Sequence, residues 1–233
     1  MIDAEWWDYD DADEMAEAVA GDIAYIIGQA LEARGRALVA FPGGTTPLPA
    51  LKLLADMKIE WADVTILPTD DRLVPVTDPM SNAGMLARLF LPKKARVLPL
   101  TAGEKDPVAA GRAADVRIAD LGWPLDVAWL GVGEDGHTAS IFNGPDFEAA
   151  ISGPKARRAI GVRPDPMPAV APVPRVTLTA ATLVSARTVT LTLTGQAKRE
   201  LVEQALKQGA SSQMPIGRLL AELDMDIDIH WCA

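Results

Sequence analysis

The spacing of hydrophobic positions changes along the chain, and these changes predict which segments form helices and which form strands. Between residues 15 and 31 apolar side chains recur every three or four positions, which places them on one face of a helix. Asp11 precedes this stripe, and Glu14 follows three residues later, so we expect a capping box where the helix begins. The stripe consists of Met15, Val19, Ile23, Ile26, Ile27 and Leu31.

Short runs that are apolar throughout predict strands that are covered on both faces. Segments of helical length, at 48–57, 83–90 and 107–121, separate most of these runs. Strands that alternate with helices predict an α/β fold with a mostly parallel sheet and crossover helices. The predicted strands are residues 37–41, 64–67, 96–100, 126–130 and 159–162, followed by 175–179, 188–194 and 226–231. Further helices are predicted at 180–186, from about residue 196, and after Pro215.

One irregular segment, residues 163–175, contains five prolines. Proline at this density fixes an extended backbone and blocks the interior of a helix or sheet. The composition favours a rigid connector, and the alternative is a wall or lid of a binding site.

Composition narrows the class of protein. The 233 residues are enough for one large domain with its own core, so we expect a single α/β domain over residues 1–233. The only cysteine, Cys232, excludes a disulfide framework and a cysteine-based zinc cage, and it suits a reducing, cytoplasmic compartment. No apolar run approaches the ~18 residues of a membrane span. The acidic N-terminus is unlike a secretory signal.

Net charge is −10, and ten carboxylates precede the first basic residue, Arg34. Nucleic-acid binding requires clustered basic residues, so the sequence predicts no nucleic-acid partner. The lack of a long apolar run predicts no membrane partner. A small anionic substrate held by a few local arginines remains compatible with this charge. The oligomeric state is not predicted.

The segment FPGGTTP follows the strand at 37–41. Thr46 is expected to cap the next helix and Pro47 to be its first residue. The turn with Gly43 and Gly44 would then direct unpaired backbone N–H groups, together with the hydroxyls of Thr45 and Thr46, to the space above the strand end, where anions bind. The alternative is an ordinary capped turn, and no Walker lysine follows.

Asp70, Asp71 and Arg72 follow the strand at 64–67, at the edge where open α/β sheets place ligands. A solvated charge cluster is the alternative interpretation. Ser81 and Asn82 are typical of the cap of the following helix.

The segment GVGEDGHTAS contains Gly-x-Gly-x-x-Gly after a strand, but it lacks the context of a dinucleotide site, because no acidic residue ends a following strand about 20 positions on. His137 lies in this glycine-rich loop near Asp135, so it is a candidate general base with a carboxylate that holds its tautomer. The alternative is a structural or merely exposed histidine. A triad of Asp135, His137 and Ser140 lacks the nucleophile elbow, and two histidines form no metal cage. Arg175 and Lys198 lie at strand ends and, as isolated basic residues, are typical of a surface.

Together FPGGTTP, TDDR, SN, GVGEDGHTASIF, RVTLT and GQAK resemble, in order and spacing, the 6-phosphogluconolactonases, and GxGxDGHTAS carries most of this resemblance. The superfamily also contains glucosamine-6-phosphate deaminases. The resemblance implies a Rossmann-like three-layer αβα sandwich. Three positions depart from the usual pattern: Pro42 replaces Ser, Asp71 replaces Glu, and Asn143 replaces Pro.

The resemblance implies hydrolysis of 6-phospho-D-glucono-1,5-lactone without cofactor or metal. It implies that His137 is the general base and that Asp70 and Asp135 lie in the catalytic pocket. The residues that it places around the phosphate and the sugar-acid oxygens are Gly43, Gly44, Thr45, Arg72, Arg175 and Lys198. Three alternatives remain open: an amino-sugar-phosphate deaminase, which would carry a further carboxylate where Phe142 stands, a non-catalytic sugar-phosphate sensor, and a nicotinamide oxidoreductase.

Overall fold

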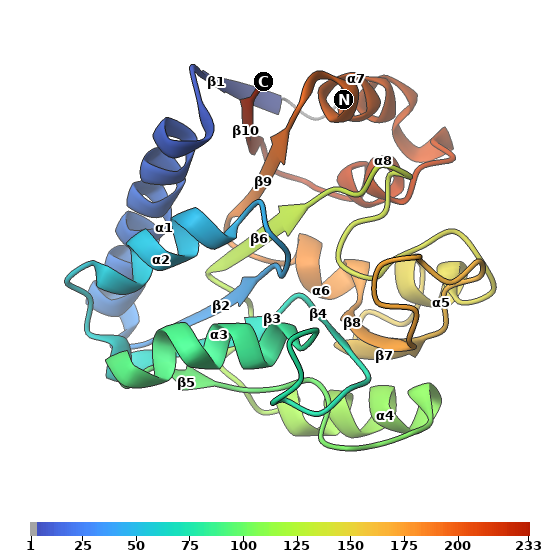
Figure 1. Ribbon diagram of the computed structural model, residues 1–233, viewed down its shortest axis with the longest axis horizontal. Helices are drawn as coiled ribbons and strands as arrows, with labels where there is room; N and C mark the ends of the chain where they lie inside the picture. The colour runs from blue at the N-terminus through green and yellow to red at the C-terminus, as the bar shows by residue number, and fades with distance from the viewer. Residues whose placement is uncertain (1–3) are drawn as a thin grey trace.

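The computed structural model describes residues 4–233, and its main feature is a seven-stranded parallel sheet in the order β1-β10-β9-β6-β2-β3-β5. In this order β1, the first strand of the chain, lies at one edge of the sheet and pairs with β10, the last strand (Figure 1). The strands are β1 (Ala4–Tyr9), β2 (Ala37–Phe41), β3 (Val64–Pro68), β5 (Arg96–Val97), β6 (Val127–Gly131), β9 (Val189–Thr194) and β10 (Ile227–Cys232).

Helices cover both faces of this sheet, and the two layers have separate apolar cores. One core packs α1 (Ala12–Arg34), α2 (Leu48–Asp56) and α3 (Asn82–Phe90) against the sheet. The other packs α4 (Pro107–Ile118), α5 (Phe147–Ile151), α6 (Ala180–Val184), α7 (Gln196–Gln208) and α8 (Pro215–Leu220). Short 3₁₀ turns lie at Trp61–Asp63, Leu91–Lys93 and Gly209–Ser211. The predicted α/β class with a mostly parallel sheet is confirmed.

The start of α1 is capped nearly as the sequence predicts. The Asp11 carboxylate accepts hydrogen bonds from the backbone N–H groups of Asp13 and Glu14, at 3.0 and 2.9 Å. Glu14 reaches back one residue further than expected, to the N–H of Asp10 at 2.8 Å. Gly35 ends the helix with φ of 66°, a left-handed conformation that glycine adopts without strain.

A second, antiparallel sheet in the order β4-β8-β7 corrects part of the strand prediction. Its strands are β4 (Asp70–Arg72), β7 (Ala159–Val162) and β8 (Arg175–Leu178). The sequence placed residues 159–162 and 175–179 among the alternating strands of a parallel sheet, and residues 70–72 in a loop. The proline-rich segment reverses the chain between β7 and β8, and so pairs them antiparallel.

One strand was missed, and two local predictions were wrong. Strand β1 was not predicted, because its half-exposed edge position lets acidic residues interrupt the apolar pattern. The expected strand at 96–100 shortens to two residues. At the start of α2, Pro47 takes the N-cap position without a side-chain bond, so Leu48 rather than Pro47 begins the helix and Thr46 does not cap it.

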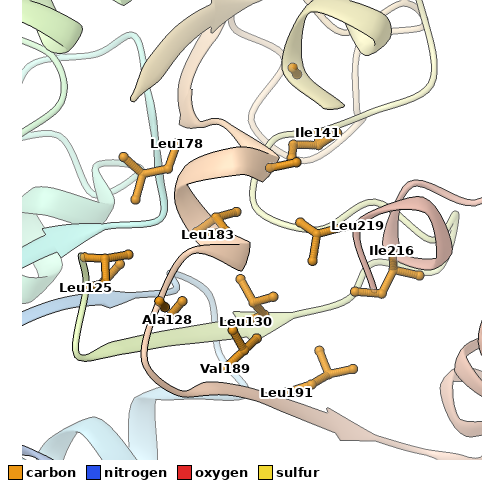
Figure 2. Close-up of a cluster of buried hydrophobic side chains, with 14 of the residues drawn as sticks. Leu125, Ala128, Leu130, Ile141, Leu178, Leu183, Val189, Leu191, Ile216 and Leu219 are labelled. Atoms are coloured by element: carbon orange, nitrogen blue, oxygen red, sulfur yellow. The ribbon is translucent and has the colours of Figure 1, made fainter. Parts of the chain in front are cut away.

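The larger core also anchors the loop that follows β6. Figure 2 shows Ile141 of this loop in one cluster with Leu130 of β6 and with Ile216 and Leu219 of α8. Ile141 is fully buried, so the segment after His137 is fixed by packing on both the sheet and α8. Within residues 4–233, no helix has the length and apolarity needed to cross a membrane.

Candidate active site

The carboxyl ends of β2, β6 and β9, together with β4, surround a cavity of about 380 Å³. This is the edge at which parallel α/β sheets bind ligands. The cavity brings together eight of the nine site residues that the sequence predicted: Gly43, Gly44, Thr45, Asp70, Arg72, His137, Arg175 and Lys198. The ninth, Asp135, contacts His137 without lining the cavity itself.

The turn after β2 presents free amides to the cavity. Among the described residues, no protein acceptor bonds to the backbone N–H groups of Gly43, Gly44 or Thr45. Gly44 has φ of 99°, which favours glycine. Gly43 lies against Asn82, and a Cβ there would overlap the Asn82 amide. Backbone amides next to the start of α2 form an environment suited to an anion.

His137 has one ring nitrogen engaged and one free. Its Nδ1 is hydrogen-bonded to Oδ1 of Asp135, whereas Nε2 has no partner among the residues that the structure describes. Gly133 makes room for the ring, since a Cβ there would overlap Cε1 of His137. The His137 side chain is 28% exposed and that of Asp135 is 63% exposed. This geometry favours a general base at position 137 over the alternative that His137 has only a structural role.

The pKa of Asp135 is lowered from its ordinary value. Burial raises it, and the hydrogen bonds and charge of His137 outweigh that effect. A carboxylate that stays ionised beside Nδ1 is the partner that orients an imidazole.

Three cations reach the cavity without a carboxylate partner of their own. Among the described residues, none of Arg72, Arg175 and Lys198 forms an ion pair within 4.0 Å. Arg175 is only 4% exposed, and its Nη2 makes only long bonds to the carbonyls of Val170 and Ala171, at 3.4 and 3.3 Å. Burial lowers the pKa of Arg175, while Asp70 opposes that shift. The Nε atoms of both arginines are buried and unpartnered. A buried cation without an ion pair, as Arg175 is, costs free energy, so this arrangement favours an anionic ligand.

The adjacent carboxylates have different roles, and the solvated-cluster interpretation is wrong. Asp70 is buried and lines the cavity. Asp71 is fully buried and accepts bonds from Ser81 Oγ (3.1 Å), Asn82 N (2.7 Å) and Ala83 N (3.2 Å), so it holds the start of α3. Burial raises the pKa of Asp71, and the bonds from the backbone of Asn82 and Ala83 oppose the shift.

Ser140 does not complete a triad with His137. Its hydroxyl donates to Oδ2 of Asp70 instead, at 2.5 Å. Residues 4–233 contain no group of three His, Cys, Asp or Glu side chains that could hold a metal ion. The cavity is lined by backbone amides and cationic side chains, which donate hydrogen bonds to anionic ligands.

Several lining residues were missed by sequence reasoning. The sequence placed Ser81 and Asn82 in the cap of a helix, and Ser81 does cap α3. Asn82 in addition forms hydrogen bonds with Arg72 and with the carbonyl of Asp70. Thr192 lies near the carboxyl end of β9, a position that could have marked it. Val170, in the proline-rich segment, lines the cavity, so this connector is also a wall.

Comparison with known proteins decides the family. The sequence model described as glucosamine-6-phosphate isomerases/6-phosphogluconolactonase matches residues 10–229. The chain belongs to this family. A 6-phosphogluconolactonase of Pseudomonas putida is 37% identical over 226 residues, covering 95% of this chain and 90% of the relative. One from Mesorhizobium japonicum is 36% identical over 232 residues, covering 97% of this chain and 94% of the relative.

Solved structures of the family have the same fold. The crystal structure of a 6-phosphogluconolactonase from Shewanella baltica OS155 superposes with a TM-score of 0.91 at 28% identity, over 99% of this chain and 98% of that one. A monomeric glucosamine-6-phosphate deaminase has a TM-score of 0.78 at 18% identity, which shows the fold alone.

Of the departures from the usual family pattern, Pro42 lines the cavity, and Asn143 donates to the carbonyl of Gln213 at 2.9 Å.

Proposed function

We propose that this chain hydrolyses 6-phospho-D-glucono-1,5-lactone to 6-phospho-D-gluconate, in the oxidative branch of the pentose phosphate pathway. The observation that carries the proposal is the imidazole of His137, which is bonded through Nδ1 to Asp135 and lines the cavity with Nε2 free. A general base needs this arrangement, with one nitrogen oriented and the other directed at the reacting proton. The relatives named 6-phosphogluconolactonase support the choice of substrate.

In the proposed reaction, neutral His137 removes a proton from water as the water oxygen attacks C1 of the lactone. Charge develops on the carbonyl oxygen, where N–H groups or cations stabilise it. The bond between C1 and the ring oxygen then breaks, and the imidazolium returns its proton to that oxygen. The product is a carboxylic acid, which ionises and releases one proton to solvent.

The phosphate supplies binding energy away from the bond that breaks. The proposed contacts to the phosphate and the sugar-acid oxygens are the amides of Gly43, Gly44 and Thr45 and the side chains of Arg72, Arg175 and Lys198. A cavity of about 380 Å³ is within the range of small-molecule sites. Binding energy from a remote group can be used to orient the reacting carbonyl.

Asp70 is proposed as a counter-charge inside this cationic cavity. Burial lowers the pKa of Arg175, and the negative charge of Asp70 opposes that shift, so Asp70 offsets part of the cost of burying the guanidinium. Asp70 is itself held by Ser140 and, at 3.3 Å, by the side-chain amide of Asn82.

The experiment is a lactone hydrolysis assay that follows acid release, with spontaneous hydrolysis subtracted. His137→Gln should lower kcat by about 10²- to 10⁴-fold. The matched control is His230→Gln, because the other histidine is buried in β10 and bonded to Tyr9. It should leave kcat unchanged. Turnover of the His137 variant near the wild-type rate would contradict the proposal.

The alternative of an amino-sugar-phosphate deaminase is tested with the same samples. Phe142 occupies the position at which the related deaminases carry a carboxylate, so this chain should release no ammonia from glucosamine 6-phosphate. A cytoplasmic location and the absence of a nucleic-acid partner stay predictions.

A further inference from the structure

Phe142 contacts two side chains that line the cavity, His137 and Arg175. Its ring is stacked on the imidazole of His137, with centroids 4.1 Å apart and planes inclined by 27°. The guanidinium carbon of Arg175 lies 5.0 Å from the centroid of the same ring. We infer that Phe142 is a positioning residue that fixes the plane of the His137 imidazole and holds Arg175 beside it. The inference rests on the proposed role of His137 as general base.

One hydrogen bond does not fix an imidazole. The bond from Nδ1 to Asp135 leaves the ring free to swing about the axis that joins the two groups, and the Asp135 side chain is 63% exposed. Contact between ring faces removes this freedom. The backbone of Gly133 contacts the edge of the imidazole near Cε1, and the Phe142 ring covers one of its faces. Together with the bond to Asp135, these contacts set the direction of Nε2.

The backbone on both sides of Phe142 is anchored. Ile141 before it is fully buried in the larger core, and Asn143 after it is bonded to Gln213. Ser140 bonds Asp70 and, through its N–H, Thr177 Oγ1 at 3.2 Å. These anchors fix the point from which the Phe142 side chain extends, and the ring then lies against the imidazole on one contact and the Arg175 guanidinium on the other.

Stacking on Phe142 also changes in strength during the reaction. When His137 takes the proton from water it becomes a cation, and the face of an aromatic ring attracts cations. The contact is therefore stronger after proton transfer than before, so it lowers the barrier and should appear in kcat. Arg175 lacks an ion pair and makes only long hydrogen bonds, so the same ring also supports the guanidinium.

The test compares Phe142→Leu, which removes the aromatic face, with Phe142→Tyr, which keeps it. In lactone hydrolysis, Leu should lower kcat by roughly 3- to 30-fold, with a smaller change in KM, and Tyr should restore most of the loss. The matched control is Phe147→Leu, because Phe147 of α5 has a similar contact, with the Arg218 guanidinium carbon 5.5 Å from its centroid. This control should keep the wild-type kcat.

A second readout needs no turnover. The chain has two histidines, so the imidazole proton resonances of His137 are assigned by their loss in His137→Gln. The Phe142 ring current should shift these resonances in wild type, and the shift should vanish in Phe142→Leu and persist in Phe147→Leu. If Phe142→Leu does not fold, Phe142→Met replaces it.

Three results would overturn the inference: wild-type kcat in Phe142→Leu, unchanged His137 resonances in that variant, or equal impairment of the Tyr and Leu variants. Failure of the wild type to hydrolyse the lactone would instead remove the proposed function and with it the catalytic part of the inference. The resonances would still decide whether Phe142 fixes the imidazole.

Discussion

The hydroxyl of Ser140 donates a hydrogen bond of 2.5 Å to Oδ2 of Asp70, and so joins the loop that carries His137 to the strand that carries Arg72. Both residues are buried. A buried carboxylate that loses a donor is left with an unsatisfied acceptor oxygen, so the loss of this bond costs more than the loss of an exposed one.

Ser140→Ala should therefore reduce both stability and activity. Loss of a hydrogen bond to a charged group costs about 1.5–3 kcal/mol, so Tm should fall by several degrees. The value of kcat/KM should fall because the Asp70 carboxylate then keeps only the longer bonds from Asn82, at 3.3 Å, and Thr69, at 3.4 Å. The matched control is Ser185→Ala, whose hydroxyl bonds only a helix carbonyl, that of Thr182, at 2.9 Å. Equal losses in the two variants, measured by calorimetry and by the lactone assay, would show that Asp70 has no special need of Ser140.

Gly133→Ala tests the position of the imidazole by pushing the ring away from Gly133, whereas Phe142→Leu removes a contact from its face. The added Cβ would overlap Cε1 and Nδ1 of His137 and approach Oδ1 of Asp135 to 2.9 Å, so the ring must move. A displacement of about 1 Å can cost about 100-fold in rate, and kcat should fall accordingly. Gly28→Ala in α1 is the control, since its Cβ meets nothing within 4 Å. Wild-type kcat in Gly133→Ala would mean that the ring position is not critical.

The parallel sheet was predictable because its strands are covered on both faces and therefore read as unbroken apolar runs. The runs at 37–41 and 64–67 begin where β2 and β3 begin. Strand β1 and the antiparallel β4 could not be found in the same way. Each pairs with a strand distant in sequence, β10 or β8, so partner contacts rather than local pattern make them strands.

The candidate site was predictable where chemistry and position coincide, as at His137 and in the turn at Gly43 and Gly44. Phe142 and Asn82 were missed as site residues because their importance comes from what they contact in space. Neither has a titratable group: Phe142 contacts His137 of its own loop and Arg175 of β8, and Asn82 accepts a hydrogen bond from Arg72. Motif spacing identifies reactive groups more readily than the residues that hold them.

The contact between His137 and Asp135 predicts a pH effect on the carboxylate. Because His137 lowers the pKa of Asp135, His137→Gln should raise that pKa, measured by carbon NMR of the side-chain carboxyl. A carboxyl whose pKa is lower in the folded than in the unfolded chain adds stability above its unfolded pKa. This stability is lost as pH falls below the ordinary value of 3.8. Wild type should therefore lose stability more steeply than the variant in that acidic range. The effect should be small because Asp135 is largely exposed. Identical carboxyl titrations in the two proteins would contradict the coupling.

Asn82 should matter for substrate binding because it links two charged residues of the cavity. Its Oδ1 accepts from Nη1 of Arg72, and its Nδ2 donates to the Asp70 carbonyl at 2.8 Å. In Asn82→Ala the guanidinium keeps its bond to the Met80 carbonyl, at 3.1 Å, but loses its second anchor. We expect KM for the lactone to rise about 10-fold, equivalent to ~1.4 kcal/mol, with a smaller change in kcat.

If Asn82 acts through Arg72, the losses in the Asn82→Ala and Arg72→Met variants should not add. A double-mutant cycle on the dissociation constant of 6-phosphogluconate, measured by calorimetry, gives the coupling between the two residues directly. In the double variant, the loss should be close to that of Arg72→Met alone, because the amide then has no guanidinium to hold. Additive losses would mean that Asn82 acts independently of Arg72, for example by holding the turn at Gly43, against which its amide packs.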